Sequence, residues 1–181
     1  GPRMAVHWGG RGPGHMSRKS STGRTWADFT AATGFVESPD NTFTRNTANS
    51  WTPRVTSNTA FTGAVRMEGI WISGADSSFG LDNNRSVTQP FNCQYGWYFS
   101  PTAGTRLSGA ARVAAGVPTA GDTYGVRKYW NGTDWTIEWY RTRSGVTTVL
   151  DTLTTATDDS LGVLYGAFLN TASSSLSGAS A

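Results

Sequence analysis

The chain contains few of the residues on which common catalytic and metal-binding sites depend. Among its 181 residues are one cysteine and two histidines. Cys93 alone can form neither a disulfide within the chain nor a cysteine-rich zinc site. His7 and His15 both lie in residues 1–24, so the rest of the sequence has no histidine to activate a nucleophile or to bind zinc. We therefore expect neither a catalytic triad nor a zinc site.

Patterns typical of membrane-spanning and nucleic-acid-binding proteins are also missing. No apolar stretch approaches the roughly 20 residues of a membrane span, and the first residues hold no apolar signal-peptide segment. Five of the 15 basic residues lie in residues 1–24, which contain no acid, so the remainder has ten basic residues against 12 acidic ones. Binding along a nucleic-acid backbone requires clustered Lys and Arg, which the remainder does not show. The sequence predicts no membrane insertion and no nucleic acid partner.

Residues 1–24 differ in composition from the rest of the chain. Gly and Pro recur throughout them, basic side chains are scattered among these, and the apolar residues follow no period. We interpret this segment as an extended, basic, Gly-rich N-terminal arm that contacts other subunits, and residues 25–181 as one β-sandwich domain. Residues 1–16 are open to two interpretations, a native segment or the remnant of an expression tag.

The composition after the arm favours β-structure. Charged residues make up 15% of the chain, whereas Gly, Ser, Thr and Asn are abundant, as in short strands joined by tight turns. The predicted strands cover residues 41–46, 53–57, 63–73, 77–81, 91–99, 105–115, 124–130, 135–141, 146–152 and 162–169. Their close spacing is typical of an antiparallel sandwich or barrel, and we expect a helical turn at 26–33 alone.

The segment NGTDWTIEWYR, residues 131–141, concentrates aromatic residues directly after a turn signal. Strand alternation places Trp135, Ile137 and Trp139 on one face, which we expect to belong to the core. Trp130 and Trp135 flank the turn itself, where a ring is easier to expose than to bury. The tryptophans that we expect in the core are Trp26, Trp51, Trp71 and Trp139.

Four segments follow one another in an order shared with a family of jelly-roll domains. They are NTFTRNTANSWTPRVTSNTAFTG, SSFGLDNN, AGDTYGVRKYWNGTDWTIEWYRTRSGVTTVLDTLT and LGVLYGAFLNTASSSLSG. The residues that match the family pattern are Trp51, Gly80, Leu81, Gly121, Asp122, Arg127, Trp139, Tyr140 and Asn170. Residues 35–180 thus resemble the concanavalin A-like lectin/glucanase domain found in phage tail, virion and bacterial surface proteins.

This resemblance implies an all-β, two-sheet antiparallel jelly-roll sandwich, whose relatives bind glycans or serve as structural decoration. One departure concerns the loops. The aromatic strand of the family runs into a tight NG turn, whereas RTRSG follows here at residues 141–145. Because binding loops vary most between relatives, this difference affects the function that the resemblance implies more than the fold.

The same fold hosts glycoside hydrolases, which need two carboxylates about 5–9 Å apart. The acids best placed on predicted strands are Glu68 and Glu138. Neither has an acidic neighbour two residues along its strand, the spacing that would point both side chains into one cleft. A pair formed across strands stays open, but we expect solvated or ion-paired carboxylates and no enzyme activity.

Calcium is the one cofactor that the sequence leaves open, because its oxygen ligands can come from loops. The candidate ligands are Asp76, Asp82, Asn83, Asn84, Asp158 and Asp159. Their spacing does not match an EF-hand loop, and turn formation by itself explains Asp and Asn in such places. We therefore expect no cofactor and no metal.

A saccharide site requires less: exposed rings that stack on the apolar face of a sugar, and polar side chains that share its hydroxyl groups. The rings that we assign to such a site are Trp97, Tyr98, Trp130 and Trp135, and the polar residues are Asn83, Asn84, Asn131 and Asp134. Turn formation is the alternative role of Asn131.

The functional hypothesis combines the resemblance with these residues. We expect a non-catalytic, tail- or capsid-associated protein of a phage virion that binds cell-surface glycans of its host and is anchored through residues 1–24. We expect a homo-oligomer on the phage particle, or alternatively on a bacterial cell surface. The alternative functions are a purely structural or decoration protein without a sugar ligand, and a carbohydrate-active enzyme module.

Overall fold

The computed structural model is built from β-strands throughout the part of the chain that it describes. It describes residues 3–7, 29–31, 35–37, 42–45, 54–73, 77–84, 92–100, 103–108, 111–167 and 173–177, with side chains in 56–71, 77–84, 92–100, 103–108 and 111–162 and at Leu164. Within these ranges there is no helix long and apolar enough to cross a membrane. The predicted all-β class is confirmed.

Fifteen strands follow one another along the described chain. They are β1 (Arg3–His7), β2 (Phe29–Ala31), β3 (Phe35–Glu37), β4 (Thr42–Arg45), β5 (Arg54–Ser57), β6 (Val65–Ser73), β7 (Ser77–Asp82), β8 (Tyr95–Phe99), β9 (Gly104–Ser108), β10 (Ala111–Ala114), β11 (Thr123–Trp130), β12 (Trp135–Arg143), β13 (Val146–Thr155), β14 (Gly162–Ala167) and β15 (Ser173–Ser177). Strands β1, β3 and β15 are not among the predicted strands, and two further details of the prediction are wrong. Strand β2 lies within the predicted helical turn, and the predicted strand 105–115 is a hairpin of β9 and β10.

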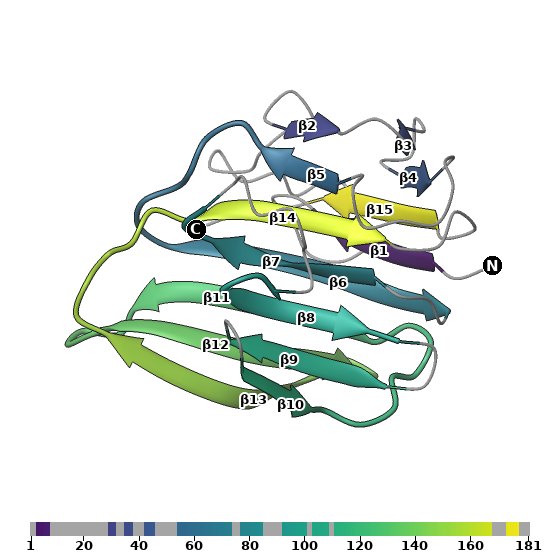
Figure 1. Cartoon of the computed structure of the whole chain (residues 1–181). Helices are drawn as coiled ribbons and strands as arrows, with labels where there is room; N and C mark the ends of the chain where they lie inside the picture. Colours follow the sequence, from purple (N-terminus) through teal and green to yellow (C-terminus); the bar gives the residue numbers. More distant parts are fainter. Residues whose placement is uncertain are drawn as a thin grey trace.

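The strands form two stacked sheets (Figure 1). The larger sheet has the order β13-β12-β11-β6-β1-β15-β4-β3, and the smaller has the order β10-β9-β8-β7-β14-β5-β2. This confirms the predicted two-sheet sandwich. One described pair, β1 with β15, runs parallel and departs from the antiparallel pattern. The predicted extended arm is wrong for residues 3–7, because they form β1 between β6 and β15 in the larger sheet, whereas residues 8–24 lie outside the described part.

The core between the sheets is rich in aromatic rings. Two of its largest fully buried side chains are Trp97 of β8 and Trp139 of β12, one from each sheet. Trp97 packs edge-on against Tyr124, with ring centroids 5.1 Å apart. Trp97 Nε1 donates to Gly125 O at 2.8 Å, and Trp139 Nε1 donates to Leu107 O at 3.1 Å. Because each indole N–H bonds the backbone of the opposite sheet, these rings set how the two sheets face each other as well as filling the core.

The other tryptophans predicted as core divide between two outcomes. Trp71 of β6 is partly buried, so the predicted core position holds for this ring only in part. Trp26 and Trp51 lie outside the described residues. Trp139 alone of the four is shown to be buried as predicted, with 0% of its surface exposed.

A buried carboxylate fixes one end of the β11–β12 hairpin. Asp122, 2% exposed, accepts hydrogen bonds from Arg143 Nε and Nη2, from the N–H of Thr119 and from the hydroxyl of Tyr124, at 2.7–3.2 Å. Burial by itself raises the pKa of Asp122, but the hydrogen bonds and charge of Arg143, together with the other two donors, outweigh it and lower the pKa below its ordinary value. This end of the hairpin is therefore closed by structural contacts.

Candidate functional site

The opposite end of the same hairpin, at the left of Figure 1, is where loops distant in sequence meet. Trp135 pairs with Trp130 on one side and with Thr155 on the other. Gly162, which follows the next loop, pairs with Asp82 at the end of β7. Strand pairing thus brings residues 82–84, 130–135 and 155–159 to one end of the sandwich, which we call the rim.

The turn at residues 131–134 is held by Asn131. Its side-chain Oδ1 accepts hydrogen bonds from the N–H groups of Thr133 and Asp134, both at 2.8 Å, and its own N–H donates to Asp134 O at 3.0 Å. Gly132 has a φ of 101°, which residues with a side chain rarely adopt. Asn131 therefore serves the turn through its oxygen, so a ligand at the rim would meet its amide nitrogen.

Two indole rings meet at the rim. Trp130 and Trp135 lie directly opposite each other across the ladder, with ring centroids 5.6 Å apart and ring planes at 61°. Trp130 is 50% exposed, whereas Trp135 is partly buried beside it. An edge-to-face pair of this kind is a favourable aromatic arrangement. The contact therefore holds an exposed apolar surface in a fixed orientation.

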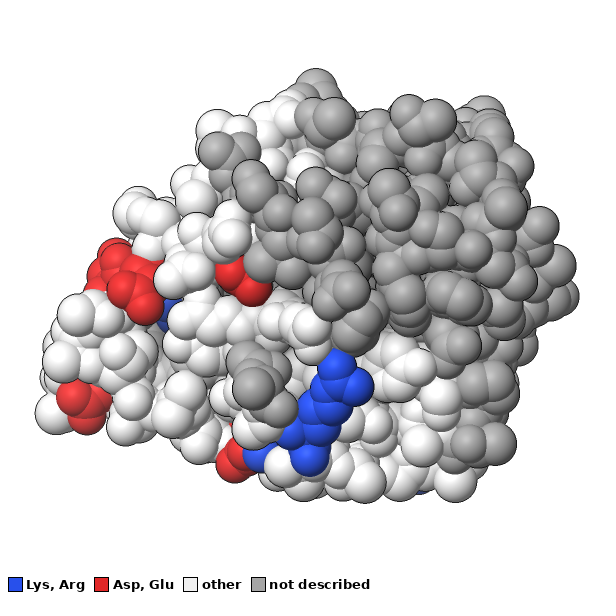
Figure 2. Space-filling view, in the orientation of Figure 1, with Lys and Arg blue, Asp and Glu red and all other residues white. Residues whose placement is uncertain are grey.

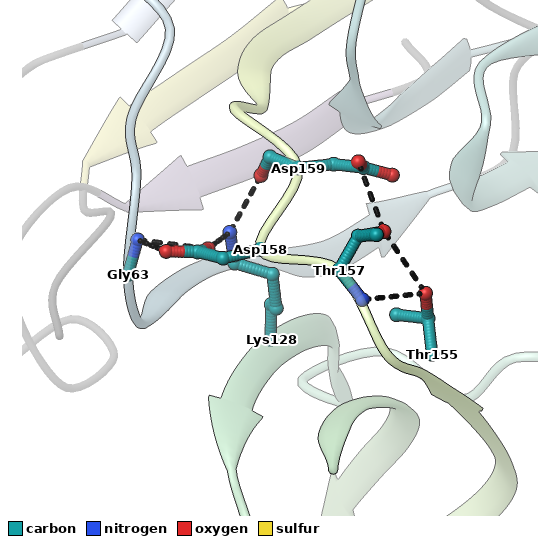
Figure 3. A network of polar contacts seen from close by, with 6 residues as sticks. All are labelled: Gly63, Lys128, Thr155, Thr157, Asp158 and Asp159. Carbon is teal, nitrogen blue, oxygen red and sulfur yellow. Dashed lines mark hydrogen bonds and ion pairs between the residues drawn. The ribbon is translucent and has the colours of Figure 1, made fainter.

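Lys128 supports this ring pair from inside the sandwich. Its ammonium lies 5.2 Å from the centroid of the Trp135 ring, a cation–π contact. Lys128 is 2% exposed, and its Nζ donates to Asp158 Oδ1 at 2.5 Å and to Asp159 O at 2.6 Å. Figure 3 shows how the network continues, because both oxygens of Asp158 also accept from the N–H of Gly63 at 3.0 Å. One buried cation thus links the hairpin to two loops and contacts the Trp135 ring of the pair.

Acidic side chains predominate at the rim. Figure 2 shows acidic side chains gathered at the left end of the molecule, where the rim lies. The acids that belong to the rim segments are Asp82, Asp134, Asp158 and Asp159. Lys128, the cation that pairs with Asp158, is buried. The described rim segments therefore carry acidic and no basic side chains, with Asp82 itself buried, which disfavours anionic ligands and permits neutral or cationic ones.

Most of the residues predicted for the saccharide site lie at the rim. They are Trp130, Asn131, Asp134, Trp135, Asn83 and Asn84, of which Asn83 and Asn84 are exposed at the end of β7. Trp97 and Tyr98 do not belong with them. The prediction that Trp97 is a binding ring is wrong, because the ring is 0% exposed in the core. Tyr98 is partly buried on the other side of β8, against a cluster of Cys93, Leu107 and Leu164.

Lys128 is the rim residue that the sequence prediction missed. Its strand face also carries Val126, which is fully buried, and Trp130. A lysine buried on such a face needs an anionic partner. Its position on an apolar strand face was therefore the signal in the sequence that pointed to a buried ion pair. Its partner Asp158 was considered in the sequence as a calcium ligand.

The two carboxylates considered for catalysis lie on the outer face of the larger sheet, away from the core and the rim. Glu68 accepts a hydrogen bond from the hydroxyl of Tyr140 at 2.6 Å and lies 3.6 Å from Arg66, whereas Glu138 accepts from Arg127 at 3.0 Å. Both glutamates are 8% exposed. Burial and the charge of Glu68 raise the pKa of Tyr140 well above its ordinary value. Each carboxylate is thus engaged in an ion pair of its own, with strand β11 between them.

The candidate calcium ligands are held by other contacts. Among the described residues, no group of three or more His, Cys, Asp or Glu side chains could hold a metal ion. Asp82 accepts hydrogen bonds from the N–H groups of Asn84 and Gln94 at 2.7 and 2.8 Å, and Asp158 pairs with Lys128. Asp76 lies outside the described residues. Turn and ion-pair roles therefore account for Asp82 and Asp158.

Comparisons with known proteins identify a fold and no family. No protein-family model matches the sequence, and no curated protein matches it. The structure is similar to the TRIM65 PSpry domain, with a TM-score of 0.53 and 12% identity over 85% of this chain and 89% of that domain. It is also similar to stonustoxin, with a TM-score of 0.52 and 15% identity over 76% of this chain, which spans 24% of the toxin chain.

A looser overlap concerns the CBM2 module of the evolved Dit of Lactobacillus casei BL23 phage J-1. It extends over 98% of this chain and 93% of that module, with 10% identity and a TM-score of 0.38. At such a TM-score the overlap bears on neither fold nor function, and at identities of 12–15% the first two likenesses bear on the fold alone. The predicted concanavalin A-like sandwich is therefore a two-layer sandwich like that of SPRY domains.

Proposed function

We propose that this chain is a non-catalytic binding domain whose rim recognises a saccharide. The observation that carries the proposal is the Trp130–Trp135 pair, in which a half-exposed indole is fixed at the end of the sandwich. A pyranose ring presents an apolar face of C–H groups, which covers an indole face and removes it from water. An exposed tryptophan that packing already orients gains from such a ligand without losing much side-chain freedom.

The polar residues around the rings match the same ligand class. Asn131, Asp134, Asn83 and Asn84 bring amide and carboxylate groups to the rim, where they can share the hydroxyl groups of a sugar. The acidic character of the rim favours a neutral or amino-substituted saccharide over a sulfated or phosphorylated one. We therefore propose neutral or amino-substituted glycans as the ligand class.

The ion pairs of Glu68 and Glu138 support a role without catalysis. A glycosidase acid must hold a proton near neutral pH and its partner must reach the same sugar, whereas here each carboxylate is bound by an arginine. A place on a phage particle or bacterial surface is the part of the proposal that follows from the sequence resemblance. Anchoring through the N-terminal segment follows from the composition of residues 1–24, of which residues 3–7 form β1 in the larger sheet.

Isothermal titration with a panel of neutral and amino-substituted polysaccharides tests the proposal. We expect one class to bind and Trp130→Ala to weaken it about tenfold or more, which corresponds to ~1.4 kcal/mol or more for a central aromatic contact. Trp130→Phe should retain part of the affinity. Val117→Ala is the matched control, because Val117 is 71% exposed but precedes β11, away from the rim. Unchanged affinity in Trp130→Ala, or a folded protein that binds none of the panel, would contradict the proposal.

A further inference from the structure

Strand β13 is the edge strand of the larger sheet, at the bottom of Figure 1, and it exposes apolar side chains. Val146, Val149, Leu150 and Leu153 are 66%, 43%, 37% and 40% exposed. Edge strands usually avoid pairing with other chains by carrying lysine or proline or by being short. Strand β13 has ten residues and carries neither lysine nor proline. Its protective features are a β-bulge and the inward-facing Asp151, which is bound to Arg106 of the same chain at 2.9 Å. Within the described sheet its outer edge has no partner strand.

The β-bulge in β13 gives this edge an unusual symmetry. Successive side chains of a strand point to opposite faces, so residues seven apart normally lie on different faces. Here Trp139 pairs with Asp151 and Tyr140 with Val149, so Leu150 is the extra residue of a bulge. As a result Val146 and Leu153, although seven residues apart, point to the same face of the sheet, the one toward the core. Val146 lies opposite Arg143 and Leu153 lies opposite Ile137.

We propose that β13 pairs antiparallel with β13 of a second copy of this chain, around a twofold axis beside Leu150. In the register that the bulge permits, Val146 faces Leu153 of the second copy, and Val149 faces Leu150 of the second copy. The twofold axis repeats both pairs, so all four exposed apolar side chains of each strand meet an apolar partner. The contact joins the two larger sheets into one continuous sheet.

Charge is consistent with this register as well. Asp151 faces Thr148 of the second copy, and its carboxylate is already neutralised by Arg106. A register shifted by three residues would place Asp151 opposite Asp151 of the second copy, and like charges directly opposite each other are unfavourable. The remaining residues of the paired segment are threonines, which pair well across strands. The pattern of β13 thus fits a second copy of itself without a charge conflict.

Sedimentation equilibrium of the full chain over a concentration series tests the proposal, with charges introduced on both sides of the axis. We expect the wild-type protein to approach twice the mass of the chain. Val149→Lys or Leu150→Glu alone should return it to the mass of one chain, because each places a charge against an apolar side chain of the second copy. The double variant V149K/L150E should restore the dimer, because each introduced lysine then faces an introduced glutamate. Val117→Lys, at a site more exposed than either, should leave the dimer intact.

Circular dichroism and thermal unfolding show whether each variant folds. Amide exchange of β13 in the wild-type protein, measured at low and high concentration, gives a readout that needs no substitution. The proposal is supported if the wild-type protein dimerises, both single variants are monomeric and the double variant dimerises again. It is supported as well if the β13 amides become more protected as the concentration rises. A wild-type monomer at all concentrations overturns it, as does a dimer that survives both single charges or one that Val117→Lys dissolves equally well. A double variant that folds but stays monomeric overturns the register. Saccharide binding is measured separately on Trp130→Ala, so either idea can fail without the other.

Discussion

Gly125 of β11 is a position where one methyl group should have a large effect. A Cβ atom placed there would overlap Cζ and the hydroxyl of Tyr140 and would lie 2.7 Å from its Cε1, which is closer than real Cβ contacts allow. Tyr140 crosses from β12 over the backbone of Gly125 so that its hydroxyl reaches Glu68 at 2.6 Å. The substitution Gly125→Ala must therefore displace the ring and break this hydrogen bond.

The expected loss follows from these two contacts. Overpacking at a well-filled site costs about 1–3 kcal/mol. A hydrogen bond to a charged group contributes about 1.5–3 kcal/mol, although Glu68 keeps Arg66 nearby, so the full amount is not lost. We expect Gly125→Ala to lower the free energy of unfolding by about 2–4 kcal/mol. For a domain of this size that corresponds to a decrease in Tm of roughly 5–15 °C.

A double-mutant cycle with Tyr140→Ala, measured by urea denaturation, tests the reasoning. Once the ring is gone, Gly125→Ala meets open space, and alanine is favoured over glycine in a strand by about 0.5–1 kcal/mol. The effect of Gly125→Ala should therefore shrink to zero or change sign in the Tyr140→Ala background. Gly104→Ala in β9 is the control, because its Cβ would lie 3.2 Å from Phe99 and requires a small adjustment. Equal losses from Gly125→Ala in both backgrounds would refute the role assigned to Tyr140.

Two further predictions concern the buried charges. Asp158→Ala should lower the free energy of unfolding, measured by urea denaturation, by about 3 kcal/mol or more, because it leaves the Lys128 ammonium buried beside one carbonyl. Lys128→Met should lower it less, because the Asp158 side chain that remains is 33% exposed and stays hydrated. Equal losses would mean that burial of the ammonium is not what matters. The lowered pKa of Asp122 adds stability that is present above its unfolded pKa of about 3.9 and is lost as the pH falls through the folded pKa. The Tm of the wild-type protein should therefore fall more steeply in acid than that of Asp122→Asn, and parallel pH profiles would argue against the Asp122–Arg143 contact.

Strand β4 and the sandwich from β5 to β14 could largely be predicted because their strands are signalled locally. In β11 and β12 the apolar residues alternate, and NGTD between them is a turn that Asn131 and Gly132 form as expected. The strands that the prediction missed lack such signals. Strands β2 and β3 have three residues each, and β1 gains its place from pairing with β6 and with the distant β15. Contacts between segments so far apart in sequence leave no periodic pattern to read.

The assignment of aromatic rings to core or surface shows a second limit. Trp130 and Trp135 flank a tight turn, and their position at the end of the hairpin follows from that local fact. Trp97 lies in YGWYF, where both strand faces carry rings, so alternation does not tell which face is core. The neighbouring strand β7 is buried along its whole length, which shows that both faces of the smaller sheet are covered there. The sequence does not show that the outer face is covered, so from the sequence Trp97 and Tyr98 are equal candidates for reaching a ligand.

Lys128 shows why the support of the ring pair had to come from the structure. Its place on an apolar strand face implies an anionic partner, but 12 acidic residues could supply one. The partner is Asp158, 30 residues away, and it arrives through the register of β13 against β12 and the loop that follows. The register of β12 against β11 brings Trp135 over the ammonium. The contact beneath the Trp130–Trp135 pair therefore depends on an ion pair that the pairing of β13 with β12 selects.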